Sequence, residues 1–405
     1  MKQTINNTKQ SIMKKYLFIA AVAVAAMACS KVDVNDTTPD VKVTFQAAKY
    51  VPQTKADTPA SLFSESIYNF PCMAFLHADG YESETQLFFG ENGETISAYT
   101  SNNVATQDAA SIDHWAPSHD YYWPKSAESY VNFVAWYDKN GAPSTKPSAS
   151  NESTLVWTFD GQTGAGHRTL ATDDNILFAD KAWHYNQNTS SSTNNSMYNT
   201  ANSLTGENQI NPFGQNGVTA GVPLLFHHAL AKLCLKAKVT KVSEGNTTWV
   251  VTLSNIKFTD VYTTGTLSLT NTEPSASTVQ TQAWTGDWSF TGQTPGDLAM
   301  TYTDALTASD AVLLPEQSIL PQALTSVHLQ FDYNISYKYN NNEYAHEKIS
   351  ADIPLTDFSP EVSSWAMNHK ITYAITINPE TTVVKIDPAM ITWVDDGTAT
   401  YSSTL

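Results

Sequence analysis

Polar and apolar residues alternate with a period of two in many segments of this chain. The clearest is residues 327–337, where every odd position is apolar and every even position is polar. Similar alternation marks residues 41–45, 131–133, 231–239, 249–253, 266–269 and 371–377. A strand of this kind buries one face and leaves the other in water, as in sheets packed face to face. No long segment has the period of a helix, so the pattern predicts an all-β fold built from β-sandwiches.

Stretches without alternation predict where loops and domain boundaries lie. Residues 186–221 are dominated by Asn, Ser, Thr and Gly, which predicts a long loop. We place the boundary between two domains at its end, with an N-terminal β-sandwich at 41–221 and a C-terminal one at 222–405. The chain is long enough for both, at roughly 150 residues per domain. Residues 139–153 predict a second long loop within the first half.

The N-terminus has the pattern of a bacterial lipoprotein signal peptide. Two lysines precede a short apolar segment, residues 16–27, and small alanines lead to Cys29. The segment is too short to span a bilayer. The pattern predicts that residues 1–28 are removed and that Cys29 becomes the lipidated first residue, followed by a polar tether at 29–40. In the alternative, the segment is an ordinary signal peptide and the cysteine is fortuitous.

The net charge argues against nucleic acid as a partner. The formal charge is −17, and removal of residues 1–28 lowers it to −21 because four lysines and no acids are lost. Arg168 is the only arginine in the sequence. A surface of this sign repels phosphate backbones.

Two cysteines, Cys72 and Cys234, remain if Cys29 carries a lipid. An exported chain meets oxidising conditions, so a disulfide between them is chemically possible. Both lie in apolar, strand-like runs, which favours buried free thiols, since unpaired cysteine is among the most buried residue types.

No motif in the sequence indicates catalysis. Residues 113–120 hold two histidines and two aspartates, but the spacing of His114 and His119 matches no structural zinc pattern. His227 and His228 are neighbours in a strand-like run, where they point to opposite faces and cannot chelate together. The sequence contains no nucleophile elbow, phosphate-binding loop, dinucleotide fingerprint or His-Glu-x-x-His motif. We expect no enzymatic activity, no cofactor and no metal site.

A series of segments along nearly the whole mature chain resembles the fimbrillin family, the major-fimbria-like lipoproteins of Bacteroidetes. The first are Val41-Lys-Val-Thr-Phe45 and Gln53-Thr-Lys-Ala56, and a later one is Pro223-Leu-Leu-Phe-His-His-Ala-Leu-Ala-Lys-Leu233. The others, in family order, are residues 121–124 with 131–137, 174–180, 312–317, 369–375 and 391–393. No single segment is specific for the family, but the occurrence of all of them in this order is fairly specific.

The resemblance implies two tandem transthyretin-like β-sandwich domains and a surface lipoprotein of the outer membrane that assembles into fimbriae. Its partners are then the membrane, through the lipid on Cys29, other fimbrial subunits, through β-strand addition, and a host or bacterial surface ligand. A protease cuts beside the first strand, and a neighbour's C-terminal strand fills the groove that opens. Carried onto this chain, the excised strand is 41–45, and the cut falls between Lys55 and Ala56.

The resemblance also places the donor strand in residues 383–405. Its pocket-filling candidates are Ile386, Ile391, Trp393 and Tyr401. The family typically has arginine at the processing site, where this chain has Lys55. Either the protease accepts lysine, or the subunit keeps its first strand and acts as a lipid-held anchor.

Trp284 and Trp288 support an alternative function. If both were exposed on a loop, they could stack on a sugar, as in a surface glycan-binding lipoprotein that does not polymerise. The competing interpretation is that they fill the core of a sandwich, because aromatic residues dominate core burial.

Overall fold

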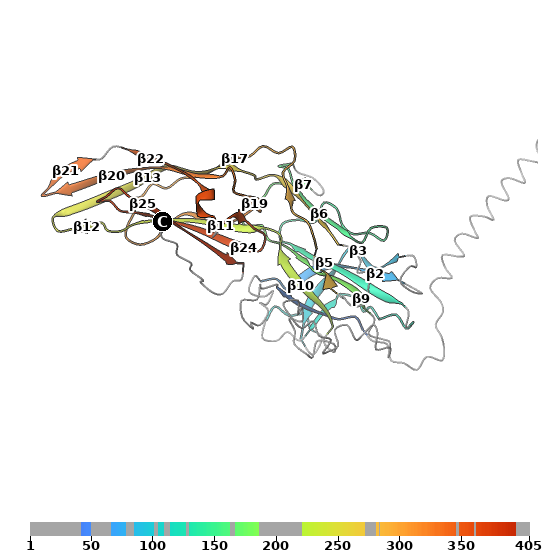
Figure 1. Cartoon of the computed structure of the whole chain (residues 1–405). Helices are drawn as coiled ribbons and strands as arrows, with labels where there is room; N and C mark the ends of the chain where they lie inside the picture. The colour runs from blue at the N-terminus through green and yellow to red at the C-terminus, as the bar shows by residue number, and fades with distance from the viewer. Residues whose placement is uncertain are drawn as a thin grey trace, which may run out of the picture. The chain divides into compact units, whose positions relative to one another are not determined.

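The fold of this chain is known from a computed structural model. It describes residues 42–49, 66–77, 85–100, 104–108, 114–126, 129–162, 167–185, 221–271, 281–282, 284–345, 348–359 and 362–393 (Figure 1). All of these belong to one compact unit, residues 41–405. Regular structure in these ranges is β-strand, apart from the short 3-10 helix η3 (Leu355–Phe358). The all-β prediction is therefore confirmed.

The largest sheet of the described ranges has nine strands and is partly closed on itself. In spatial order they are β15 (Thr281–Gln282), β9 (Lys181–Tyr185), β5 (Tyr130–Asp138), β2 (Asn69–His77), β3 (Thr85–Tyr99), β4 (His114–Pro117), β1 (Phe45–Lys49), β10 (Val222–His228) and β8 (Ile176–Ala179). Because β5 also pairs with β8, the described strands from β5 through β2, β3, β4, β1 and β10 to β8 form a hydrogen-bonded ring.

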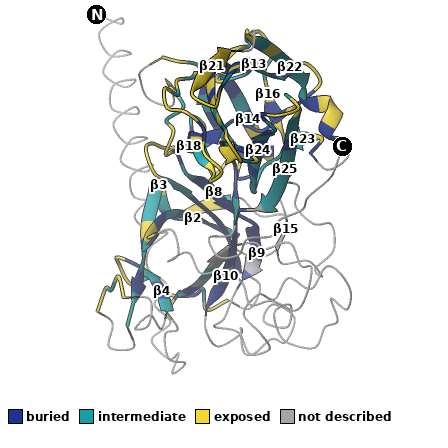
Figure 2. Ribbon diagram, turned by 90° about the vertical axis from the view of Figure 1, so that its left-hand side faces the viewer, coloured by how far each residue is buried: buried dark blue, intermediate teal, exposed yellow. Residues whose placement is uncertain are grey.

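The interior of this ring is a hydrophobic core. Its buried members come from nearly every strand of the ring and include Phe45, Phe70, Phe133 and Phe226, each 0% exposed (Figure 2). Alternation along the strands explains this arrangement, because in β5 Val131, Phe133 and Ala135 face the ring core while the residues between them face outward.

Two further sheets form a sandwich. One consists of β18 (Ala311–Ile319), β11 (Ala231–Val239), β24 (His369–Ile377) and β25 (Val384–Thr392). The other contains β12 (Ser243–Glu244), β13 (Thr247–Val261), β20 (His328–Tyr339), β21 (Asn342–Ala345), β17 (Gly296–Met300) and β22 (Ile349–Pro354). One core joins them, with Leu235 and Ile371 from the first sheet and Val251 and Leu329 from the second.

Two smaller sheets complete the described strands. The first is β16 (Trp288–Ser289), β14 (Gly265–Thr270), β6 (Thr154–Phe159) and β7 (His167–Arg168), and the second pairs β19 (Gln322–Ala323) with β23 (Ser364–Trp365). The first covers the outward face of β5 in a third core, where Trp157 and Leu267 pack with Trp136. No helix within the described ranges is long and apolar enough to cross a membrane.

Most of the predicted strands are present. Residues 327–337 fall on β20 and 371–377 on β24, and in β11 Leu233, Leu235, Ala237 and Val239 are buried, as alternation requires. The predicted loop at 139–153 lies between β5 and β6. The strand predicted at 41–45 is misplaced, because β1 begins only at Phe45 and the preceding residues make a single bridge, from Lys42 to Tyr122.

Strand pairing crosses the predicted domain boundary at residues 221 and 222. β10 lies in the ring between β1 and β8, β14 pairs with β6, and β15 pairs with β9. Strands that follow the boundary in sequence therefore complete sheets that begin before it. The predicted loop at 186–221 lies outside the described residues except for Gly221, and the division into two domains stays a prediction.

Candidate functional site

The first strand, β1, is inserted between two other strands of the ring. On one side it pairs with β10 in parallel, from Phe45 opposite Val222 to Lys49 opposite Phe226. On the other side it meets β4 through the pair Phe45 and Trp115, and the Val43 N–H donates to the Tyr121 carbonyl at 2.8 Å. β1 is thus the one link between β4 and β10 among the described strands, and it closes the ring there.

Two apolar side chains fix this segment in the core. Val43 is 2% exposed and Phe45 is fully buried, with its ring edge-on to Phe133 at a centroid distance of 5.3 Å. Gly221 allows the close approach of the two chains, because a Cβ there would lie 2.5 Å from the Thr44 carbonyl oxygen and its φ is +109°. The Val222 N–H donates to that same oxygen at 2.8 Å. The site is therefore a preformed slot for one extended segment.

Loss of β1 would leave this slot open on both sides. The edges of β10 and β4 would then present unpaired backbone N–H and C=O groups, and the space left by Phe45 would be an apolar pocket between them. Such an edge with a side-chain pocket is the arrangement that recruits another strand. Sequence reasoning placed the first strand a few residues too early, at 41–45, and missed β10 and β4 as the walls of its slot, since long-range pairing leaves no local signal.

The residues predicted to be lipidated and cleaved are not among those that the structure describes. Cys29, Lys55, Ala56 and the tether at 29–40 all lie outside the described residues, as does Tyr401. Their roles stay predictions.

The other donor candidates are held within their own chain. β25 lies at the edge of its sheet, antiparallel to β24, with Ile386 4% exposed in the sandwich core and Ile391 half-buried. Trp393 is 2% exposed and stacks on His228 at 3.8 Å, while its backbone N–H donates to the Asn368 carbonyl at 2.7 Å. Ile386 and Trp393 therefore pack in cores of their own fold and are not available to a neighbour while β25 is in place.

The two tryptophans of the alternative function are buried. Trp284 is 7% and Trp288 8% exposed, and both belong to the core outside the ring. Their indole N–H groups donate to the carbonyls of Ala179 and Ala229, each at 2.8 Å. The interpretation in which both tryptophans fill a core is therefore confirmed, and the alternative of an exposed stacking platform is not supported, because their polar atoms are already satisfied inside the protein.

The remaining candidate chemistry is structural. Cys72 and Cys234 are free and buried, as predicted, and burial raises the pKa of both thiols. His227 contacts Asp180 at 2.9 Å, while His228 contacts Asn175 at 3.0 Å, so the two neighbours do not share a ligand. Where the structure describes the chain, no group of three or more His, Cys, Asp or Glu side chains is placed to hold a metal ion.

Solved structures of similar fold include a candidate cell adhesion protein from Bacteroides uniformis (15% identity, 87% of this chain and 99% of that one, TM-score 0.41). They also include a fimbrial protein from Bacteroides vulgatus (14%, 88% and 100%, 0.42) and the fimbrial anchor protein Mfa2 from Porphyromonas gingivalis (10%, 88% and 98%, 0.32). No curated protein matches. The model of the fimbrillin-like family matches residues 83–393, most of the chain, and the chain therefore belongs to the fimbrillin-like family.

Proposed function

We propose that this chain is a subunit of cell-surface fimbriae that is joined to its neighbour by exchange of β1 for an incoming strand. Membership of a family of fimbrial proteins supports a structural or adhesive role. The observation that carries the proposal is the place of β1, which is short, lies near the N-terminus and is inserted between β4 and β10.

Export as a lipoprotein precedes assembly in this proposal. The signal pattern ends at Cys29, whose acyl chains would hold the precursor at the outer membrane. A cut after Lys55 would then separate β1, together with the lipid, from the rest of the chain. If the cut does not occur, the subunit keeps β1 and remains a membrane-held anchor.

The tail after Trp393 is the best remaining source of a donor strand. From Ala399 onward, alternate positions are Ala399, Tyr401, Ser403 and Leu405, and the positions between them are all threonine or serine. In an extended strand, one face would therefore carry the larger apolar groups. The slot of β1 takes a similar pattern, with Val43 and Phe45 buried, so we propose that Tyr401 occupies the Phe45 pocket of the next subunit.

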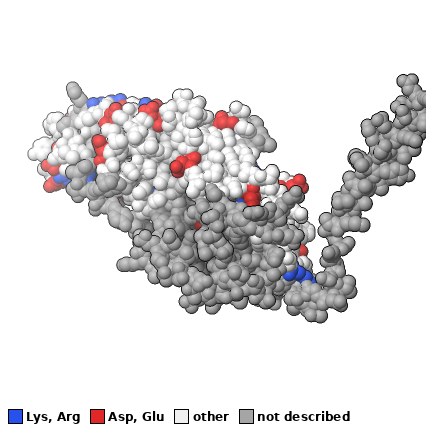
Figure 3. Space-filling model, turned by 45° about the vertical axis from the view of Figure 1, so that its right-hand side comes forward, with Lys and Arg blue, Asp and Glu red and all other residues white. Residues whose placement is uncertain are grey.

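The charges of the surface fit a role without nucleic acid. In the view of Figure 3, acidic side chains are scattered over the described part of the face and the basic ones lie mostly near its margins. A nucleic-acid site needs clustered Lys and Arg to neutralise phosphates. We therefore propose proteins of the same fimbria, and a surface ligand in the case of an adhesive tip, as the partners.

The N-terminal residue of the surface-exposed protein tests this proposal. Mass spectrometry of the chain recovered from cells, with and without protease inhibitors, should find a start at Ala56. The matched variants are Lys55→Arg, which should increase the fraction cut by an arginine-specific protease, and Lys55→Gln, which should retain Cys29 as the first residue and stop polymerisation. Fimbriae that contain only chains beginning at Cys29 would contradict strand exchange.

A further inference from the structure

A cluster of buried polar side chains lies on the outward face of the ring, opposite the ring core. It consists of Asn132 in β5, Lys181 in β9, Glu152 in the loop before β6 and His77 at the end of β2. Asn132 and Lys181 are 0% exposed and Glu152 is 9% exposed. A fully buried lysine is rare in proteins and needs a charged partner.

Both Asn132 and Lys181 contact the same carboxylate. The Asn132 Nδ2 donates to Glu152 Oε1 at 3.2 Å and Oε2 at 3.3 Å, and the Lys181 Nζ lies 3.4 Å from Oε2. Phe133 of β5 pairs with Ala182 of β9 in antiparallel register. The residues that precede these two, Asn132 and Lys181, therefore lie diagonally across from each other on the same face of the sheet. Diagonal neighbours are within reach of a long side chain.

The surroundings separate the lysine amine from water. The Nζ lies 3.5 Å from the ring centroid of Trp183 and 3.4 Å from Glu152 Oε2, and both contacts stabilise an ammonium group. An amine is nucleophilic only when it is neutral, so the ammonium must first give a proton to Glu152. Burial opposes ionisation of Glu152, but the hydrogen bond from His77 and the charge of Lys181 outweigh it and lower the pKa of Glu152, so the group is ionised and can receive that proton.

We propose that the Lys181 amine and the Asn132 carboxamide form an intramolecular amide crosslink, with Glu152 as the proton carrier. The Lys181 Nζ forms a bond to Cγ of Asn132, and the bond from Cγ to Nδ2 breaks. Of the three Nζ protons, one stays on the new amide and two pass through Glu152 to Nδ2, which leaves as ammonium. The reaction needs no oxidant or other reactant, and it replaces a buried charge by a neutral group.

The crosslink would tie β5 to β9 covalently. β5 is the strand that pairs with both β2 and β8, so it holds the part of the ring that is left when β1 departs. A covalent tie there would resist pulling along a fibre. This inference does not depend on the proposed function, because the cluster is separate from β1 and its slot.

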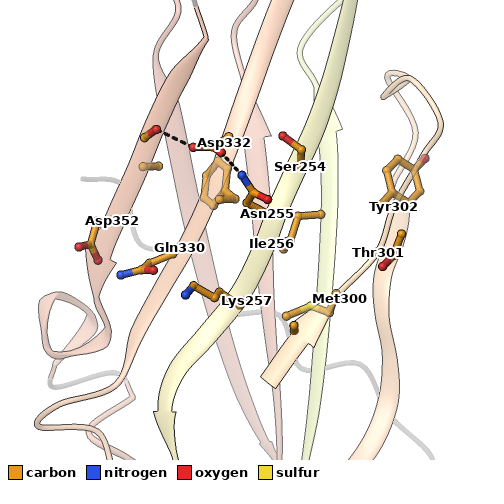
Figure 4. Close-up of a pocket in the computed structure, with 14 residues that line it drawn as sticks. Ser254, Asn255, Ile256, Lys257, Met300, Thr301, Tyr302, Gln330, Asp332 and Asp352 are labelled. Carbon is orange, nitrogen blue, oxygen red and sulfur yellow. Dashed lines mark hydrogen bonds between the residues drawn. The ribbon is translucent and has the colours of Figure 1, made fainter. Parts of the chain in front are cut away.

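The chain contains a matched control. Asp332 also contacts a lysine, through Lys348 Nζ at 2.6 Å. It accepts a hydrogen bond from Asn255 Nδ2 as well, and Asp332 and Asn255 both line an open pocket of about 800 Å³ (Figure 4). The Lys348 side chain is 55% exposed, however, so its amine stays hydrated. The lysine and the asparagine should remain unlinked at this site, although both contact a carboxylate here too.

Peptide mapping of the folded full-length chain tests the proposal. Trypsin should not cut after Lys181, and residues 126–139 should appear joined to residues 169–232, lighter by one ammonia than the two peptides together. Cleavage after Lys181 with a free 126–139 peptide in the wild-type chain would overturn the proposal without recourse to any variant. Glu152→Gln should abolish the linked peptide, and a link that persists in this variant would refute the role of Glu152. Asp332→Asn should change neither result.

Discussion

Replacement of Phe45 by alanine separates a structural role in the precursor from a role in the fibre. Phe45 is fully buried in the ring core and packs edge-on against Phe133. If β1 is lost during assembly, Phe45 contributes to the stability of the precursor but not to that of the assembled subunit. The substitution should therefore weaken one form and leave the other unchanged.

The expected loss is large because a whole aromatic side chain is removed from a packed site. A buried Phe→Ala substitution costs about 3–5 kcal/mol, from lost burial and the cavity that remains. The unfolding entropy is about 2.1 cal/mol/K per residue, so in the unit 41–405 a loss of 1 kcal/mol lowers Tm by roughly 1–2 °C, and the precursor's Tm should fall by about 4–8 °C. The backbone pairing of β1 with β10 does not involve the side chain and should persist.

Phe226 provides the matched control. It is also 0% exposed and belongs to the same core, with its ring centroid 4.9 Å from that of Phe70, but it lies on β10, which the proposed processing would leave in place. Thermal unfolding should be followed for the uncut precursor, fixed by Lys55→Gln, and for subunits in isolated fimbriae. Phe226→Ala should lower Tm in both forms, and Phe45→Ala only in the precursor.

Two results would refute this reasoning. A precursor whose Tm is insensitive to Phe45→Ala would show that the side chain does not fill the ring core. Fimbriae weakened by Phe45→Ala as much as the precursor would show that β1 stays in place in the fibre, and strand exchange would then be wrong for this chain.

Three further predictions concern sites away from β1. Iodoacetamide should label Cys72 and Cys234 only after denaturation, because both thiols are buried and burial raises their pKa; rapid labelling of the native chain would contradict this. The pKa of Asp332 is lowered from 3.8 to about 2 by hydrogen bonds from Lys348, Ser350 and Asn255. This carboxylate therefore stabilises the folded state above pH 3.8, and that contribution is lost as the pH falls towards 2. The urea midpoint of unfolding should therefore decline less steeply with falling pH in Asp332→Asn than in the wild-type chain. Equal slopes in the two proteins would exclude the effect. Trp288→Ala should destabilise the chain by about 3–5 kcal/mol, because the side chain is buried. Added oligosaccharides should leave the tryptophan fluorescence of the wild-type chain unchanged. Saturable quenching would restore the glycan-binding alternative.

The local features of this fold follow from the sequence. Alternation identifies β11, β20 and β24, because each has one face in a core and one towards water. The loop at 139–153 follows from its polar and turn-forming composition. These features depend on residues close together in sequence, so they can be predicted without knowing which strands pair with one another.

The ring could not be predicted in the same way. β1 pairs in parallel with β10, far along the chain, and a parallel pair has no connecting turn to mark it. The composition of residues 186–221 indicates a loop but does not show which sheet the next strand joins. Trp284, Trp288 and Trp393 illustrate the same limit, since an aromatic residue near a polar stretch has one sequence pattern whether it is buried or exposed.

The connectivity of the ring would allow the proposed replacement of β1 without unfolding of the acceptor. When β1 leaves, β10 still pairs with β8 and β4 still pairs with β3, so every remaining strand of the ring keeps a partner. The pairing of β5 with β8 and β2 keeps the open ring continuous from one side of the slot to the other. The cost of removing β1 is then confined to its own pairings and to the pocket of Phe45, which an incoming strand with a large side chain at that position can restore.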